Sequence, residues 1–533
     1  MEENYIERVF EETEDGLDTI SSVQDEARVR VSSMHPALPI LDLHGVTRTG
    51  VHDSLFAALQ AKLLGRVDEL DQKGLAKLLE KCFRHISSKE LRGVCLQIMQ
   101  KLPEVDEKYL LHISDNQELY QACPIEVKRQ IWQTNQGFFG EAVSPLLDLY
   151  IAEKESILFS THETGEKKTP TSFLSIPPKI RRQSQVMQDL VHMVRSSQDL
   201  YNTLLQFLRT LFLRTQVSHY CTLRADILMS LHELDSTGRL CECDPCHKFA
   251  WCLDACIRAG FVDEKKSREL YSFLEGIEPG RETLGDVAML LRDPYALNAI
   301  CSSILKCLTE LYENYKLPRE SSELECLLRL LQLGTSAHAI MDSESYHETA
   351  LDVELLIKFL PELLSIMSEN TLRAIAHKFK EEYRPFTSSP HFVTALSNPC
   401  AMHITCFYAL GLLAKKELKS FSLVLPLVAK GYTQSESAQL PDIFLHLLVV
   451  GLLEYPVSIR ETTMQAILRE FWLVCAQSSE TALLHLCHLL WGLHSKINPG
   501  ILEEILDEMK PGDGQSEVAH QQYRTLMEHI EDS

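Results

Sequence analysis

Apolar residues recur with helical spacing along almost the whole chain. When successive residues of the segment 204–215 are placed 100° apart, one arc holds Leu204, Phe207, Leu208, Leu211 and Phe212. The segments 222–235 and 352–367 repeat this spacing, and we expect Pro361 to kink or divide the second of them. The segment 481–497 is apolar nearly all round, which is typical of a deeply packed helix.

Strand signals are sparse by comparison. No Asn-Gly or Asp-Gly turn separates two alternating apolar runs, and Gly, Pro and Ser punctuate the chain at intervals that suit helices of about 12–20 residues. Successive amphipathic helices over several hundred residues predict an all-α protein built as an irregular helical-repeat solenoid. The sequence has no strict repeat period and no tetratricopeptide or ankyrin consensus, so a degenerate array of the HEAT or armadillo kind fits best.

Changes in composition divide the predicted helices into blocks. Residues 1–30 hold ten Asp and Glu against three Arg, which favours a solvated tail. A polar, proline-bearing stretch at 160–183 is interpreted as a loop, with a weaker boundary at 314–323. The predicted organisation is an acidic, flexible tail (1–35), an N-terminal helical block (36–160), a basic loop (161–183), a central helical block (184–316), a C-terminal helical-repeat block (317–510) and a tail (511–533).

The overall composition is that of a globular protein, with 45% hydrophobic and 24% charged residues among 533. No apolar run is long enough to span a membrane, and the acidic N-terminus lacks the apolar core of a signal peptide. The 16 cysteines are therefore expected to be reduced thiols of a cytosolic or nuclear protein. The net charge of −23 argues against wholesale wrapping of nucleic acid.

One region runs against this acidic balance. Residues 179–224 hold seven Lys and Arg against two Asp, and two further lysines stand just upstream. A local basic region can contact phosphate in an acidic protein, although charged stretches are more often solvated helix faces. Arg209 and Arg214 fall on opposite rims of the helix at 204–215 and so do not form one patch. The candidate RNA or phosphate contacts are Lys167, Lys168, Lys179, Arg181 and Arg182.

The stretch CECDPCHKFAWCLDAC, residues 241–256, holds five cysteines and one histidine. Asp244 and Pro245 predict a helix start and Gly260 a helix end, which places Cys246, Cys252 and Cys256 on the core face. Cys246 and Cys252 are then about 9 Å apart along the axis, too far to share a zinc ion. Cys252 and Cys256 remain weak metal candidates, but core packing is favoured over a zinc or redox role, and no cofactor is expected.

Catalytic signatures are absent from the sequence. It contains no Walker A motif, no GxGxxG after a strand, no GxSxG, no HExxH and no kinase motif set. His232, His446 and His485 lie in leucine-rich helices, where a histidine is more often a packed residue than a general base. We therefore expect no enzymatic activity.

Three segments carry a closer resemblance: ELYQACPIEVKRQIWQ (118–133), the helical pair at 204–235, and DPCHKFAWCLDACIRAGFVD (244–263). Together with 38–45, 141–160, 327–334 and 442–448, in the same order, they resemble the family of the B subunit of the negative elongation factor complex, the cofactor of BRCA family. The resemblance runs over roughly residues 36–450 and is densest in the middle third. Cys243 departs from the family pattern, which lowers the zinc interpretation further.

This resemblance implies a nuclear, HEAT-like scaffold in a four-subunit complex. The complex holds RNA polymerase II paused near promoters, together with the Spt4–Spt5 factor. The B subunit bridges the C (or D) subunit, which carries A, to the E subunit, which carries an RNA-recognition domain. Direct RNA contact through residues 167–224 is a secondary hypothesis.

Two other classes of protein stay open at this stage. An unrelated helical-repeat adaptor, such as a transport receptor or a phosphatase scaffold, would have the same composition and periodicity. A zinc-dependent protein or enzyme could be built on residues 241–256, although this fits less well.

Overall fold

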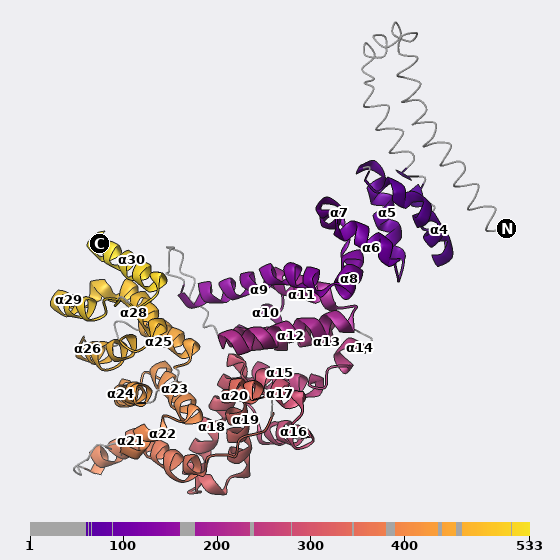
Figure 1. Cartoon of the computed structure of the whole chain (residues 1–533). Helices are drawn as coiled ribbons and strands as arrows, with labels where there is room; N and C mark the ends of the chain where they lie inside the picture. The colour runs from indigo at the N-terminus through magenta and orange to yellow at the C-terminus, as the bar shows by residue number, and fades with distance from the viewer. Residues whose placement is uncertain are drawn as a thin grey trace, which may run out of the picture. The chain divides into compact units, whose positions relative to one another are not determined.

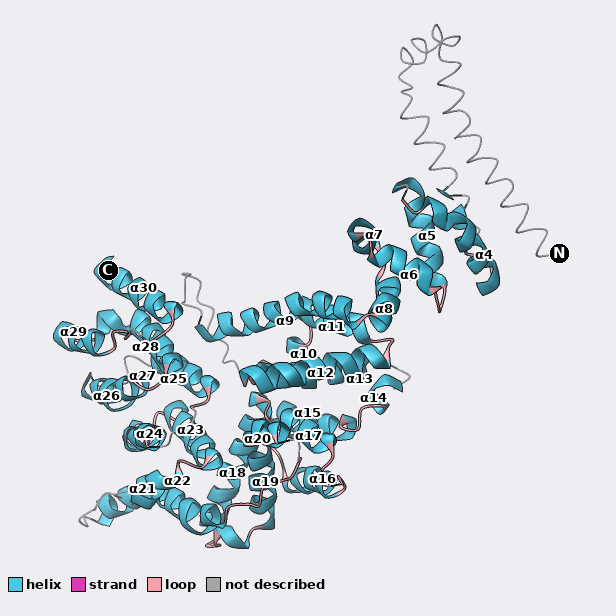
Figure 2. Cartoon of the chain, in the orientation of Figure 1, coloured by secondary structure: helices cyan, strands magenta, loops and turns pink. Residues whose placement is uncertain are grey.

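The computed structural model describes residues 60–159 (apart from 62, 66 and 88), 176–234, 239–278, 280–343, 346–379, 390–434, 440–454, 461–512 and 514–532. Within these ranges all regular structure is helical and no strand occurs (Figure 2). The all-α, helical-repeat prediction is thus confirmed. The predicted tail at 1–35 and the loop residues 161–175, with Lys167 and Lys168, lie outside the described residues.

The chain divides into two compact units, residues 1–143 and residues 144–533, which are described separately. The helices of the first unit are short and follow one another closely (Figure 1). They are α4 (Gln72–Cys82), the 3-10 turn η1 (Phe83–His85), α5 (Lys89–Lys101), α6 (Glu107–Ser114), α7 (Gln117–Ala122) and α8 (Ile125–Thr134). The division between the units falls inside α9 (Gln136–Phe159).

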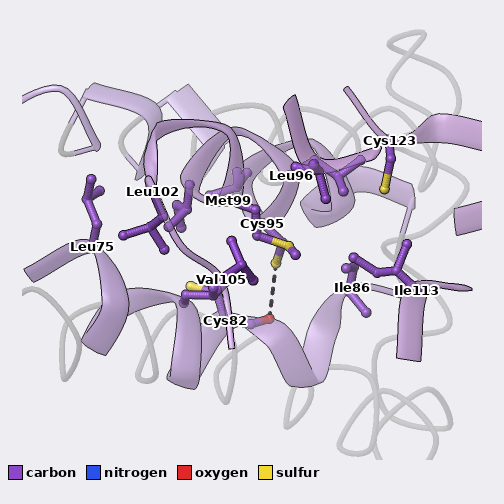
Figure 3. Packing of buried hydrophobic residues seen from close by; sticks show 14 of the residues in the cluster. Leu75, Cys82, Ile86, Cys95, Leu96, Met99, Leu102, Val105, Ile113 and Cys123 are labelled. Atoms are coloured by element: carbon purple, nitrogen blue, oxygen red, sulfur yellow. Dashed lines mark hydrogen bonds between the residues drawn. The ribbon is translucent and has the colours of Figure 1, made fainter. Parts of the chain in front are cut away.

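An apolar cluster that runs from Leu63 to Ile131 joins the described helices of the first unit. Figure 3 shows Cys95 of α5 packed against α4, where its thiol donates a hydrogen bond to the carbonyl of Cys82 at 3.3 Å. Gln130 of α8 ties the loop after α5 to this core, since its Oε1 accepts from the Val105 N–H at 2.8 Å and its Nε2 donates to the Leu102 carbonyl at 3.3 Å. Buried polar backbone in the turn is thereby satisfied.

The second unit begins with an antiparallel arrangement of long helices. Its first helices after α9 are α10 (Pro178–Arg181), α11 (Gln185–Val194), α12 (Gln198–Thr215), α13 (His219–Leu234), α14 (Arg239–Glu242), α15 (His247–Ala259), α16 (Glu264–Glu275) and α17 (Glu282–Leu291). Both predicted helices at 204–215 and 222–235 are present, as α12 and α13. The turn between them passes through Gln216 in the left-handed conformation, with φ of 58°.

The remainder of the second unit is a two-layer stack of helices. One layer consists of α18 (Pro294–Glu313), α23 (Pro399–Ala414), α25 (Asp442–Glu454), α28 (Glu480–Leu493) and α30 (Glu517–Asp532), each in contact with the next (Figure 1). The other layer includes α19 (Ser322–Thr335) against α18 and α24 (Leu418–Thr433) against α23. The remaining segments are the 3-10 turn η3 (Pro318–Glu320), α20 (Ala337–Asp342), the π turn η4 (Leu355–Phe359), α21 (Leu360–Phe379), α22 (Pro390–Ala395), α26 (Glu461–Ile467), the π turn η5 (Leu468–Leu473), α27 (Val474–Ala476), the 3-10 turn η6 (His494–Lys496) and α29 (Pro499–Glu508).

The π turn η4 lies directly before Pro361, at the position where the sequence predicts a kink. Proline lacks the N–H that would close an α-helical turn, so the preceding backbone is released from the regular pattern. Local chemistry alone accounts for this feature.

The end of the chain differs from the prediction of a tail at 511–533. Residues 517–532 form α30, whose start is capped by Ser516, with Oγ accepting from the Ala519 N–H at 3.3 Å. The rings of His529 on α30 and Trp491 on α28 are stacked, with centroids 3.8 Å apart and planes 6° apart. The helix is therefore stabilised by tertiary contacts that its polar composition does not reveal.

Candidate functional site

A groove of about 1210 Å³ is formed by four helices of the second unit: α18, α21, α23 and α25. Its walls are mainly apolar and include Leu364, Met367, Phe407, Leu447 and Val450. The two helices α23 and α25 approach closely at Gly451, where an added Cβ would lie 2.6 Å from a Leu413 side-chain carbon. Close helix packing thus gives the groove a rigid back wall.

Acidic side chains outnumber basic ones along this groove. Glu310, Glu313, Glu417 and Glu454 line it, against Lys306 and Lys415. Lys306 is partly neutralised already, because its Nζ lies 3.9 Å from Glu310 and 4.9 Å from the centre of the Phe261 ring. An apolar groove with a net negative border is complementary to a partner that carries apolar and basic side chains.

Three large side chains are exposed at and just beyond the C-terminal end of α18, and the first of them, Tyr312, also lines the groove. Tyr312 is 40% exposed, Leu317 is 47% exposed and Tyr315 is 97% exposed. Tyr315 also has φ of 52°, a left-handed conformation that glycine adopts at less cost. A large aromatic side chain is thus presented to solvent at a position where helix termination alone would favour glycine.

The predicted phosphate contacts Arg181 and Arg182 are both buried, although the sequence suggested a basic loop. Arg182 lies among three carboxylates: its Nε is 3.3 Å from Asp226, its Nη1 is 2.8 Å from Glu233, and its Nη2 contacts Asp254. The guanidinium carbon of Arg181 lies 3.6 Å from the centre of the Tyr295 ring, and its Nη2 lies 3.6 Å from Asp226.

These contacts correct the prediction for the two arginines. Burial opposes the charge of Arg181, but its carboxylate neighbours outweigh this and raise its pKa. Both guanidinium groups are therefore buried beside internal carboxylates and anchor α10 on α13 and α15, so they do not present their charge to a phosphate. Lys179 on the same short helix is exposed, and phosphate contact by Lys179, Lys167 and Lys168 stays a prediction.

Asp244 does not cap α15 as the sequence analysis expects. The helix begins at His247, and the Asp244 carboxylate instead accepts hydrogen bonds from the Tyr201 hydroxyl at 2.6 Å and the Cys246 N–H at 2.8 Å. The fully buried Arg224 lies 3.5 Å from the same carboxylate. Asp244 turns inward because the buried charge of Arg224 is costly unless a carboxylate lies beside it. At its other end the helix stops at Gly260 as predicted, with φ of 75°.

Four of the five cysteines of residues 241–256 pack into the core, in line with the predicted core packing. Cys241, Cys246, Cys252 and Cys256 are buried, while Cys243 is exposed. The thiols of Cys252 and Cys256 interact with each other, which lowers the pKa of Cys252 and, together with burial, raises that of Cys256. Among the described residues no group of three or more His, Cys, Asp or Glu side chains gathers closely enough to hold a metal ion.

The histidines singled out in the sequence occupy different environments. His485 is buried on α28, with its Nε2 3.4 Å from Asp442, and His446 is buried on the neighbouring α25. His232 is exposed on α13, and its Nδ1 lies 3.1 Å from the Nε2 of His247. In the part of the chain that the structure describes, no helix is both long enough and apolar enough to span a membrane.

The stacked helices define a class: an all-α helical-repeat protein. The family model described as Cofactor of BRCA1 (COBRA1) matches residues 89–430. The chain is 40% identical to Negative elongation factor B of Mus musculus and of Homo sapiens, each over 97% of this chain and 90% of the relative. It is 38% identical to the Drosophila melanogaster protein of the same name, over 99% of this chain and 90% of the relative.

The chain therefore belongs to the Cofactor of BRCA1 family, which includes the negative elongation factor B proteins. The family resemblance expected from residues 118–133, 204–235 and 244–263 is confirmed. The groove could not be predicted from the sequence, because its walls come from four helices spread over residues 294–454. An apolar helix face also looks the same whether it meets another helix or a partner.

Proposed function

We propose that this protein is a non-catalytic, nuclear scaffold subunit of the negative elongation factor complex, and that it supports pausing of RNA polymerase II near promoters together with the Spt4–Spt5 factor. In this role it bridges the C (or D) subunit, which carries A, to the RNA-binding E subunit. The observation that carries the proposal is similarity to negative elongation factor B proteins along almost the entire chain.

A helical-repeat body suits a bridging role for a physical reason. Each helix packs on its neighbours, so two distant surfaces keep a defined spacing without a single globular core. Binding at such surfaces comes mainly from a few buried apolar anchors, while charges set the encounter rate and the register. The mechanism is thus the positioning of partners.

The groove of α18, α21, α23 and α25 is the proposed seat of one partner segment, a basic amphipathic helix. The apolar side chains of such a helix would contact Leu364, Phe407 and Val450. Its Lys or Arg residues would face Glu313 and Glu454, both of which are exposed. The acidic border makes an acidic partner helix unfavourable there.

The bridging proposal is tested by co-expression with the C and E subunits from the same source, separately and together, followed by light-scattering mass. A ternary species that retains E only in the presence of this chain is the expected result. If neither subunit co-purifies, the chain is an adaptor of another kind, such as a transport or phosphatase scaffold, and the bridging role is wrong.

The groove is tested in the same experiment by charge reversal. The double variant Glu313→Lys and Glu454→Lys should release one of the two partner subunits while leaving the other bound. Glu508→Lys, an exposed glutamate of α29 that does not line the groove, is the matched control and should retain both. Retention of both subunits by the double variant would place their interfaces elsewhere.

Direct RNA contact is a second candidate role, favoured by the exposed Lys179 within the predicted basic loop at 161–183. The triple variant Lys167→Gln, Lys168→Gln, Lys179→Gln should weaken RNA binding by the full chain and reduce its salt dependence. An unchanged salt dependence would exclude these lysines as phosphate contacts.

A further inference from the structure

A second cavity, of about 680 Å³, lies in the second unit where α12 turns into α13. Its lining comes from segments far apart in the sequence, among them residues 214–219, the junction of α17 and α18, α23, and the start of α25. The proposed scaffold function makes no use of it. Two arginines, Arg214 and Arg292, contribute to its lining.

Arg292 is the unusual feature of this cavity. Its backbone N–H closes the last turn of α17, bonding the Ala288 carbonyl at 2.9 Å, but its guanidinium forms no ion pair or hydrogen bond in the part of the chain that the structure describes. Its neighbour Asp293 is engaged elsewhere, because its carboxylate accepts from the Thr222 hydroxyl at 2.8 Å. Burial lowers the pKa of Arg292, which reflects the cost of a desolvated cation.

The fully buried arginines of this unit differ from the half-buried Arg292 in having partners. Arg181, Arg182 and Arg224 each have at least one carboxylate within 3.6 Å. A half-buried guanidinium that lines a cavity without a counter-charge is partly desolvated, and unpaired groups of this kind gather at binding sites. Arg292 is therefore placed to receive an anion from outside the chain.

His403 on α23 supplies a second polar group to the same cavity. Its Nδ1 lies 2.9 Å from the Pro399 carbonyl, which can only accept, so Nδ1 carries the ring proton and Nε2 is left for other contacts. Burial and the nearby charge of Arg292 lower the pKa of His403 to about 4. A bound anion would offset the charge of Arg292 and favour a protonated, donating Nε2.

The charges around the cavity limit the kind of anion. Glu155 and Asp442 also line it, so a polyanion would meet two carboxylates as well as Arg214 and Arg292. Phe407, Tyr432, Leu297 and Ile443 provide apolar and aromatic walls. This combination fits a single phosphate group, held by arginine in the paired geometry that guanidinium favours, on an uncharged body that contacts the walls.

We propose that this cavity binds a small phosphate monoester of about the size of a nucleoside monophosphate, with Arg292 as the principal phosphate ligand and Arg214 at the cavity wall. The proposal is independent of the bridging role, since neither Arg292 nor Arg214 lines the groove. It requires the full chain, because the lining residues span 155–481.

The test is isothermal titration calorimetry of the full chain with adenosine 5′-monophosphate, with inorganic phosphate and adenosine as separate arms. The expected result is saturable binding of the monophosphate, weaker binding of phosphate and none of adenosine. Arg292→Gln should weaken binding of the monophosphate at least about tenfold, as expected for loss of a charge-assisted pair. Arg319→Gln, an exposed arginine of η3, is the matched control and should bind like the original chain.

A second variant keeps the test decisive if Arg292→Gln disturbs folding. Arg214 is exposed, so Arg214→Gln should keep the melting temperature and still weaken binding about threefold, because an exposed contact is worth less. Absence of saturable monophosphate binding, equal binding by the Arg292 variant, or adenosine binding as tight as that of the monophosphate would each overturn the proposal. Binding of single-stranded RNA without monophosphate binding would overturn it as well.

Discussion

Arg209 on α12 holds Asp286 on α17 through two parallel contacts, from Nε to Oδ1 at 2.7 Å and from Nη2 to Oδ2 at 2.5 Å. The Asp286 carboxylate is buried, and its Oδ2 also lies 3.4 Å from Arg224. The pair joins two helices whose residues are 77 positions apart. Its two-pronged geometry depends on a planar guanidinium, so the charge alone does not reproduce it.

We expect Arg209→Lys to lower the free energy of unfolding by about 1–3 kcal/mol, because lysine keeps the charge but leaves one oxygen of a buried carboxylate without its donor. Urea unfolding followed by tryptophan fluorescence would measure this, since three of the four tryptophans, Trp251, Trp472 and Trp491, belong to the second unit. Arg319→Lys at an exposed site should leave the unfolding curve unchanged. Equal curves for both variants would mean that the pair contributes only charge.

Replacing either of two helical glycines with alanine should change the stability in opposite directions. A Cβ added at Gly334 of α19 would lie 2.7 Å from the backbone carbonyl oxygen of Leu291, whereas one at Gly411 of α23 would meet nothing within 4 Å. Gly334→Ala should therefore cost about 1–3 kcal/mol through overpacking, and Gly411→Ala should stabilise by up to about 1 kcal/mol through helix propensity. Melting temperatures should move in opposite directions, and a rise for Gly334→Ala would contradict the close approach of α17 and α19.

Thiol reactivity should separate one cysteine from the other fifteen. Cys243 is exposed and Cys326 is half-buried, while the remaining fourteen are buried. Burial raises the pKa of Cys400 and of Cys475 to about 12, which keeps these thiols protonated and unreactive. A chromogenic disulfide reagent at pH 7.5 should show one fast thiol and one slower one, with the rest appearing only in urea.

The variant Cys243→Ser should remove the fast phase and leave the melting temperature unchanged. A loss of stability in this variant, together with zinc in protein purified without chelators, would revive a metal site at residues 241–256 and contradict the packed core.

Stability should fall in mild acid because of buried histidines. Burial lowers the pKa of His219 and of His403 to about 4, against about 6.5 in an unfolded chain. Between these values the unfolded chain binds more protons, so both histidines reduce stability as the pH falls from about 6.5 towards 4. Burial also raises the pKa of Asp293 to about 6; this group acts in the opposite direction and offsets part of the loss.

The melting temperature should consequently drop between pH 7 and pH 5. His403→Gln should make that dependence shallower, since one of the groups that protonate on unfolding is removed. His520→Gln, at the start of α30, is a suitable control for the loss of a histidine in general. An equally steep pH dependence in the His403 variant would show that other groups dominate.

Much of the fold follows from local patterns. The spacing at 204–215 and 222–235 corresponds to α12 and α13, Gly260 ends α15, and the π turn η4 precedes Pro361. Each of these depends on neighbouring residues, because helix periodicity and helix ends are set by contacts within one or two turns. The burial of the cysteines of α15 was predictable for the same reason, since their arc on the helix coincides with that of Phe249.

The roles of the charged residues could not be predicted in this way. Arg182 looks like part of a basic loop, yet its partners Asp226 and Asp254 stand 44 and 72 residues further along the chain. The same holds for Asp244, whose inward position is set by Tyr201 and Arg224. Whether a charge is paired depends on distance in space, which single-residue properties do not contain.

The sequence by itself determined most of the helices, the end of α15 at Gly260, the core face of α15 and the family. Tertiary structure alone decided which arginines are neutralised inside, that Arg292 is left without a carboxylate, and that α18, α21, α23 and α25 leave a groove with an acidic border. The reason is the separation along the chain of the residues that interact. Helix formation is local, whereas cavities and ion pairs arise where segments distant in sequence meet and exclude water.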